Sequence, residues 1–360
     1  MRINLSMFAC MFIILTYCFK LTDILCQSSK SIQEEVTIRN DSILLSGTFT
    51  KPSGEDKFTT LIFIWGNGPH TRDQEISGTP VFRIISDSLV NNGFATLRID
   101  KRGFGKSTGY RSGSETVTTT LDLASDIEAC REYLLTRNDV DTSKIGLIGH
   151  SEGAMIAPYV AVISGGIAFE ILIAPPAVNG QEIFLSQRIK NMNSLGMEKD
   201  VIPKVYEQFE ILTDFIKTDY SDDSVYYSIG KDFLMAHGLS ENDVNNDFID
   251  QVIDGFRNPW HQVFFNFDPE IYLSKLRIPV LAVFGREDNQ VTVEQNAEPL
   301  KTDLEKAGNK NYKIEVLEDN DHYFLLYNGV RLEKHKPGEM EVSGELISTV
   351  LNWLDNLSLK

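Results

Sequence analysis

A serine between two glycines is the residue of this chain whose surroundings most clearly suit a catalytic role. Gly149, Ser151 and Gly153 stand where an apolar run, KIGLIGH, ends and a helical pattern begins. Small neighbours permit a sharp turn that projects the hydroxyl clear of the backbone, as a nucleophile requires. A serine at the start of a helix can equally serve only as its N-cap. The choice depends on which other polar residues the fold brings to it.

Two such residues follow strand-like runs further along the chain. Asp288, with Glu287 beside it as an alternative acid, follows PVLAVFG, and His322 follows YKIEVLE. Because functional groups gather at the carboxyl ends of parallel strands, Ser151, Asp288 and His322 are expected to meet at one edge of a sheet. A serine becomes nucleophilic when an imidazole accepts its proton, and a carboxylate fixes that imidazole. The order serine, acid, histidine is the one that the α/β-hydrolase fold requires, so the three predict a catalytic triad.

An acyl-transfer site also needs donors for the developing oxyanion, each worth roughly 3 to 4 kcal/mol of barrier. The backbone amide of Glu152, at the start of the helix after the serine, is one candidate. The second is expected in the turn after LIFIWG, from the amide of Asn67 or that of Gly68.

The other histidines have simpler explanations. His150 is expected to pack behind the serine turn rather than to react, and His70 either lines the pocket or lies in a solvated turn. His237 and His261 fall in a helical insertion, where contact with substrate is the less favoured reading.

Paired charges near two turns are predicted to stabilise loops rather than to catalyse. They are Arg72 with Asp73 and Asp100 with Arg102. The neighbouring stretch GFGKS lacks the glycine spacing of a phosphate-binding loop, so that interpretation is discarded.

The elements that must position these residues alternate between short β-rich runs and longer amphipathic ones, which is typical of βα units around a mainly parallel sheet. An antiparallel hairpin is expected at 34–51, followed by parallel strands and helices. The helix at 121–137 is expected to bury one stripe formed by Leu121, Ala124, Ile127, Cys130, Leu134 and Leu135. Further strands are expected at 59–66, 95–100, 144–150, 168–176, 278–285 and 312–319, and further helices at 81–92, 293–307 and 342–357.

The alternation breaks between residues 177 and 277, where the pattern is helical, acidic and rich in aromatic residues. This predicts a helical cap inserted into the core. The expected organisation is therefore a signal peptide at 1–26, a first core segment at 27–176, the cap at 177–277 and a second core segment at 278–360.

The first 26 residues have the composition of a secretory signal peptide. An arginine at position 2 precedes an apolar segment too short for the roughly 20 residues that a membrane span requires. Cleavage after Cys26 is predicted, giving an exported protein without stable membrane insertion; a lipid anchor on Cys26 and an uncleaved anchor are the alternatives. Three of the four cysteines lie in this leader, so Cys130 remains alone and is expected to be a buried small hydrophobe.

The net charge of the chain limits the classes of molecule that it is expected to bind. A formal net charge of −17 and a pI near 4.8 argue against nucleic acid and anionic membranes, since both require clustered Lys and Arg. The predicted partner is a small-molecule substrate, and the composition does not specify the oligomeric state.

Four segments carry a resemblance to a known family: WGNGPHTRD at 65–73, DKRGFGKST at 100–108, GHSEGA at 149–154 and GREDNQV at 285–291. They resemble the motifs of serine esterases in the α/β-hydrolase superfamily, near the dienelactone hydrolase-like and acyl-peptidase-like enzymes. The resemblance spans roughly residues 35–176 and 278–357. It departs from the family pattern at Trp65, usually His, at Asn67, usually Ser, and at Ala154, usually Gly. The first departure bears on the shape of the turn after LIFIWG, called the oxyanion turn below because the second oxyanion donor is expected there.

The resulting hypothesis is a capped α/β-hydrolase that cleaves carboxylic esters through an acyl-serine intermediate. Ser151 attacks, His322 carries the proton, Asp288 orients His322, and the amides of Asn67 and Glu152 hold the oxyanion. This chemistry requires no metal or organic cofactor. A peptidase or amidase, an acyltransferase or thioesterase, and a binding protein without activity are the alternatives.

Overall fold

The computed structural model describes residues 31–54, 56–109, 118–218, 223–326 and 340–359. The predicted signal peptide lies outside these residues. Among the helices of the described ranges, none is long and apolar enough to cross a membrane.

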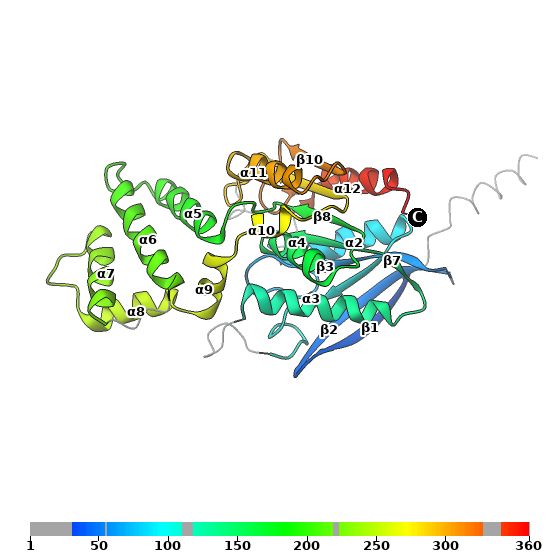
Figure 1. Ribbon diagram of the computed structural model, residues 1–360, viewed down its shortest axis with the longest axis horizontal. Helices are drawn as coiled ribbons and strands as arrows, with labels where there is room; N and C mark the ends of the chain where they lie inside the picture. The colour runs from blue at the N-terminus through cyan, green and yellow to red at the C-terminus, as the bar shows by residue number, and fades with distance from the viewer. Residues whose placement is uncertain (1–30, 55, 110–117, 219–222, 327–339, 360) are drawn as a thin grey trace, which may run out of the picture.

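A mostly parallel sheet of eight strands forms the centre of the molecule (Figure 1). The hairpin β1–β2 pairs antiparallel, β2 also pairs antiparallel with β6, and the remaining neighbours are parallel. This confirms the predicted fold class. In spatial order the strands are β1 (Ser31–Asn40), β2 (Ile43–Pro52), β6 (Ala95–Ile99), β3 (Phe58–Ile64), β7 (Val140–His150), β8 (Phe169–Ile173), β9 (Val280–Gly285) and β10 (Tyr312–Leu317).

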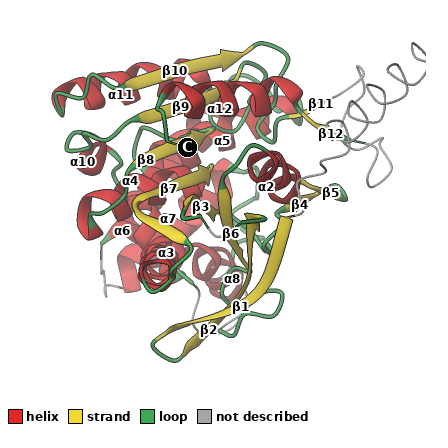
Figure 2. Ribbon diagram, turned by 90° about the vertical axis from the view of Figure 1, so that its right-hand side faces the viewer, coloured by secondary structure: helices red, strands yellow, loops and turns green. Residues whose placement is uncertain are grey.

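Helices cover both faces of this sheet (Figure 2). On one face α2 (Val81–Asn91) packs against α12 (Gly344–Asn356). On the other, α3 (Thr120–Leu135) packs on α4 (Glu152–Ser164), and α10 (Glu270–Leu273) joins α4 to α11 (Val293–Lys306). Strands covered on both faces are mainly apolar, and every residue of β3, β6, β8 and β9 is buried.

The buried face of α3 differs from the predicted stripe at both ends. Leu121 and Leu135 are 42% and 37% exposed, whereas Leu123 is buried. The helix begins at Thr120, after a capping box in which Thr119 and Asp122 satisfy each other's backbone amides. From this start, Leu123, Ile127, Cys130 and Leu134 follow the helical period and share one face, and Leu121 points away from it. Cys130 is buried as expected, and burial raises the pKa of its thiol well above the ordinary value.

Two pairs of two-residue strands were not predicted. They are β4 (Glu75–Ile76) with β5 (Thr79–Pro80), and β11 (Leu325–Leu326) with β12 (Glu341–Val342). A hydrogen bond of 2.9 Å from Thr79 Oγ1 to the carbonyl of Met340 links the two pairs. They hold in place the loops on either side of the predicted site.

Helices α5–α9 lie between β8 and β9 and form the predicted cap, whose domain boundaries remain a prediction. In Figure 1 α5 to α8 project to one side of the sheet, and α9 lies nearer to the core. The cap has its own apolar cluster, which includes Phe209, Phe215, Phe233, Phe264 and Phe265. The helices are α5 (Gly180–Ser194), α6 (Ile202–Lys217), α7 (Asp223–Ala236), α8 (Asn246–Phe256) and α9 (Pro259–Asn266).

Candidate active site

Ser151 lies in a strained turn between β7 and α4. Its φ of 54° and ψ of −118° are rare for a residue with a side chain. A Cβ at Gly149 would collide with the carbonyl of Gly153, and a Cβ at Gly153 would collide with the carbonyl of Ile64 in the adjacent strand. The two glycines are therefore required by backbone contacts that the turn itself creates, and Ser151 stands at the end of the strand as expected.

Asp288 and His322 are brought together by the loops after β9 and β10. His322 Nδ1 lies 2.8 Å from Asp288 Oδ2, and both residues are buried. The other carboxylate oxygen, Oδ1, accepts the amides of Gln290 and Val291 at 2.7 and 2.8 Å. The competing acid, Glu287, is exposed. Asp288 is thus the acid whose position is fixed on the imidazole.

The structure does not join Ser151 to His322 by a hydrogen bond. Within the described ranges the Ser151 hydroxyl has no hydrogen-bonding partner, and neither does His322 Nε2. Hydrogen bonds of this kind are often long before a substrate binds and tighten in the Michaelis complex. Among the described residues, no other group occupies the serine hydroxyl or Nε2 of His322.

The backbone amides at the start of the turn after β3 differ in their partners. Gly66 donates its amide to Gln74 Oε1 at 3.1 Å, and Gly68 donates its amide to the side-chain oxygen of Asn67 at 2.7 Å. The Asn67 amide has no acceptor among the described residues, so of the two amides considered from the sequence it is the available one. As the first residue of α4, Glu152 also has an amide without an intrahelical acceptor.

Buried Lys101 fixes the shape of this turn. Its Nζ donates to the carbonyls of Gly66 and Gly68 at 3.1 and 3.2 Å, and it lies 3.9 Å from Glu152 Oε2. Burial lowers the pKa of Lys101, and the Glu152 carboxylate opposes that shift. His70 also contributes, with Nε2 2.8 Å from the carbonyl of Asn67, and burial lowers the pKa of His70 to about 4. His70 therefore shapes the turn as a neutral ring.

Trp65, the main departure from the family motif, is buried below the turn. Its indole Nε1 donates to the carbonyl of Ile99 at 2.8 Å, and its side chain is fully buried. The residue belongs to the core between β3 and β6 and does not line the site.

A buried relay that the sequence did not suggest connects the two sides of the site. Gln74 Nε2 lies 3.0 Å from His150 Nδ1, and His150 Nε2 lies 2.8 Å from the carbonyl of His322. With Gln74 Oε1 on Gly66, the relay runs from the oxyanion turn to the His322 loop. Burial lowers the pKa of His150 well below its ordinary value, with the neighbouring His322 as a second cause. His150 therefore packs behind the serine turn, as predicted, and is neutral.

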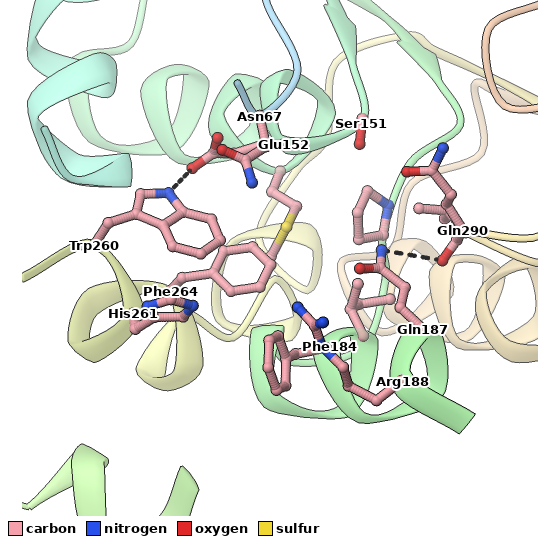
Figure 3. A pocket seen from close by; sticks show the side chains of 14 residues that line it. Asn67, Ser151, Glu152, Phe184, Gln187, Arg188, Trp260, His261, Phe264 and Gln290 are labelled. Carbon is pink, nitrogen blue, oxygen red and sulfur yellow. Dashed lines mark hydrogen bonds between the residues drawn. The ribbon is translucent and has the colours of Figure 1, made fainter. Parts of the chain in front are cut away.

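A cavity of about 290 Å³ opens in front of Ser151, between the core and the cap (Figure 3). The core contributes polar groups and the cap contributes mainly aromatic rings, which suits an ester with an apolar part. The lining residues include Asn67, Ser151, Glu152, Met155 and Gln290 from the core, and Phe184, Gln187, Arg188, Trp260, His261 and Phe264 from the cap. Of the two cap histidines only His261 is among them, because His237 packs on Phe209 and Phe233.

Glu152 ties the cap to the serine turn. Its Oε1 accepts hydrogen bonds from Trp260 Nε1 at 2.8 Å and from Thr120 at 2.7 Å (Figure 3). The side chain is buried next to the serine. This contact fixes α9 over the site, and no motif in the sequence indicated it, because the partner lies 108 residues away.

The predicted turn-stabilising charges do pair, but with other partners than their sequence neighbours. Arg72 binds Asp100 through two hydrogen bonds of 2.9 and 3.1 Å. Asp73 pairs instead with Arg98, and Arg102 binds Asp126 and Asp122 on α3. Asp100 also accepts the amide of Lys106 at 2.9 Å. The charges link the turns to the sheet and to α3, which spacing along the chain could not predict.

Comparison with known proteins gives the family of this chain. Residues 80–326 match the family described as serine aminopeptidase, S33. The chain belongs to this family. The esterase EstD of Thermotoga maritima is 26% identical over 322 residues, which cover 89% of this chain and 67% of EstD.

Two solved structures show the same fold as this S33 family member. The esterase PF2001 of Pyrococcus furiosus has a TM-score of 0.54 at 17% identity, over 90% of this chain and 91% of its own. Est1E of Butyrivibrio proteoclasticus, solved with ferulic acid, has a TM-score of 0.53 at 19% identity, over 90% of this chain and all of its own (100%). The predicted resemblance to α/β-hydrolase serine esterases is confirmed, and the chain is a hydrolytic enzyme.

Proposed function

We propose that this enzyme is a carboxylic ester hydrolase that works through an acyl-serine intermediate. Ser151 Oγ attacks the ester carbonyl while His322 Nε2 takes its proton, and the amides of Asn67 and Glu152 receive the negative charge on oxygen. His322 then returns the proton to the departing alcohol as the carbon–oxygen bond breaks. Water, deprotonated by His322, attacks the acyl-serine and releases the acid.

One observation carries this proposal: Ser151 lines the cavity from a strained turn, and Asp288 holds the imidazole of His322 in one orientation. Ser151 lines the cavity with a backbone conformation that costs on the order of 1–3 kcal/mol, a cost that a mere helix cap does not need. Asp288 holds Nδ1 of His322, which leaves Nε2 as the nitrogen that can accept a proton. The names of EstD and PF2001, both esterases, support the same reaction.

An aminopeptidase is the second candidate, because the family description names that activity. The cavity argues against it. An aminopeptidase must bind a cationic amino terminus, yet the cavity presents the cation Arg188. Of the Glu152 carboxylate that also lines the cavity, Oε1 accepts from Trp260 and Thr120 and Oε2 faces the Lys101 ammonium at 3.9 Å. Ester hydrolysis without an amino-terminal requirement fits these groups better.

A comparison of substrates on one preparation tests the assignment. We expect turnover of short p-nitrophenyl esters, loss of that turnover in Ser151→Ala, and little or no release of p-nitroaniline from aminoacyl p-nitroanilides. Faster cleavage of the anilides than of the esters would overturn the assignment in favour of a peptidase.

We also propose that the enzyme is exported. The support is the sequence alone: a basic start, an apolar segment and predicted cleavage after Cys26. Mass spectrometry of the mature amino terminus, with fractionation of the cells, tests this. An unprocessed chain in the cytoplasmic fraction would contradict it.

A further inference from the structure

Arg188 is a cation in the cavity that has no ion-pair partner among the residues described by the structure. It lies on α5 and lines the cavity, and Figure 3 shows its guanidinium nitrogens pointing from that helix into the cavity. Its Cζ lies 4.5 Å from the centre of the Phe184 ring, so one face of the guanidinium is stacked. Its Nε is buried without an acceptor, and within the described ranges no carboxylate forms an ion pair with it.

Such an arrangement is costly unless a ligand completes it. A buried donor without an acceptor destabilises the folded state, and a chain with a net charge of −17 has many carboxylates that could have paired with an arginine. The stacked position on Phe184 also limits the directions in which the guanidinium can turn. The arginine is thus positioned to pair with an anion that no residue in the described ranges supplies.

The other charged groups around the cavity leave this role to Arg188. Glu152 is an anion whose Oε1 accepts from Trp260 and Thr120 and whose Oε2, without a hydrogen bond among the described residues, lies 3.9 Å from Lys101. His261 is neutral at ordinary pH, because burial and then the charge of Arg188 lower its pKa to about 4. Gln187, the neighbour of Arg188 on α5, donates to the backbone carbonyl of Gln290 at 3.3 Å and is uncharged.

We propose that Arg188 is a specificity-determining residue that binds a carboxylate carried by the substrate, so that the preferred substrates are esters with an anionic group. This proposal rests on the proposed esterase function. Planar guanidinium and carboxylate groups pair through two parallel hydrogen bonds, which fixes the substrate as well as attracting it. The carboxylate can belong to the acyl part, as in a half-ester of a dicarboxylic acid, or to the alcohol part.

Two matched substrate pairs distinguish these sources. For the acyl part, mono-p-nitrophenyl glutarate is compared with p-nitrophenyl hexanoate. For the alcohol part, 4-acetoxybenzoate is compared with its methyl ester. The wild type is expected to show the higher kcat/KM for the anionic member of at least one pair.

The variants test whether Arg188 causes this preference. Arg188→Met is expected to lower kcat/KM for the anionic ester about 10- to 100-fold and to leave the neutral ester within about threefold. Arg188→Lys keeps the charge without the planar guanidinium, and its kcat/KM for the anionic ester is expected to lie between those of wild type and Arg188→Met. Lys204→Met is the matched control, since it removes a cation from an exposed position of the cap on α6. Equal losses on both esters, or no preference in either pair of the wild type, would overturn the proposal.

A binding measurement separates failure of this proposal from failure of the esterase assignment. Glutarate is titrated by calorimetry into Ser151→Ala and into Ser151→Ala/Arg188→Met, where no turnover is involved. Binding to the first protein and its loss in the second supports the carboxylate site even if no ester is cleaved. Absence of binding to the first protein overturns it.

Discussion

His322 Nδ1 lies 2.8 Å from Asp288 Oδ2, and this one contact fixes how the imidazole can act. Because Nδ1 donates to the carboxylate, Nε2 is the nitrogen with a free lone pair. The second oxygen of Asp288 is held by two backbone amides, so the carboxylate cannot rotate away. The loop that ends β9 thereby sets the tautomer of a ring on the loop that ends β10.

Replacing this acid tests the contact. Asp288→Asn keeps the shape but presents an amide that favours the wrong tautomer, and kcat/KM for esters is expected to fall by a factor on the order of 10³ to 10⁴. Glu287→Gln, at the exposed neighbouring acid, is expected to change kcat/KM less than about twofold. Equal effects of the two variants on ester turnover would contradict the assigned acid.

The glycine at 153 is predicted to be irreplaceable for backbone reasons. In Gly153→Ala the new methyl group would meet the carbonyl oxygens of Ile64 and Trp65, so the free energy of unfolding should fall by about 1–3 kcal/mol. Gly255→Ala, in α8, meets nothing within 4 Å and should stabilise by up to about 1 kcal/mol. Urea unfolding of both variants gives the comparison, and a neutral result for Gly153→Ala would refute this packing argument.

The Gln74 relay is predicted to support both stability and turnover. Gln74→Leu leaves the Gly66 amide and His150 Nδ1 without partners, each at a cost of about 1–3 kcal/mol. We expect a lower melting temperature and a kcat for esters reduced about tenfold with KM little changed, because the turn that carries the Asn67 amide is loosened. Thr71→Ala, at an exposed position in the same turn, is the control. A loss of stability with unchanged kcat would limit Gln74 to a structural role.

Glu170 is predicted to make stability depend on pH. It is fully buried in β8, neither carboxylate oxygen has a hydrogen bond within the described residues, and burial raises its pKa from 4.5 to about 8. Between these values the folded state holds a proton that the unfolded state releases. This contribution to stability is therefore complete below about pH 4.5 and is lost as pH rises to about 8, at about 1.4 kcal/mol for each pKa unit.

Glu170→Gln is expected to remove that dependence. Urea unfolding should show that the variant is more stable relative to wild type at pH 9 than at pH 5. The control Glu198→Gln, at an exposed position, should leave the free energy of unfolding unchanged at both pH values. If wild type and Glu170→Gln differ by the same amount at both pH values, Glu170 is not titrating as stated.

The sequence was informative where the chemistry depends on local order along the chain. The glycines at 149 and 153 mark the strand–turn–helix junction, and Asp288 and His322 follow apolar runs whose ends lie at one edge of a parallel sheet. Because connections in such sheets are regular, three strand ends were enough to predict the fold and to choose the candidate residues. The cap was predicted by the loss of strand-like alternation.

Contacts between segments that are distant along the chain could not be predicted from the sequence. Arg72 pairs with Asp100 rather than with its neighbour Asp73, and Trp260 donates a hydrogen bond to Glu152, 108 residues away in the sequence. Gln74 and Arg188 carry no motif, and their importance appears only when buried atoms are matched with partners. On α3, helical spacing from Ile127 does place Leu123 on the buried face and Leu121 off it, so the predicted stripe was wrong at this end.

The most direct test of the central claim is covalent labelling of Ser151. Folded enzyme is treated with a fluorophosphonate, digested, and analysed by mass spectrometry, with Ser151→Ala and His322→Ala in parallel. We predict one adduct on Ser151, none in Ser151→Ala, and labelling slowed at least about 100-fold in His322→Ala. An unlabelled wild type, or an adduct on another residue that persists in Ser151→Ala, would contradict the proposed nucleophile.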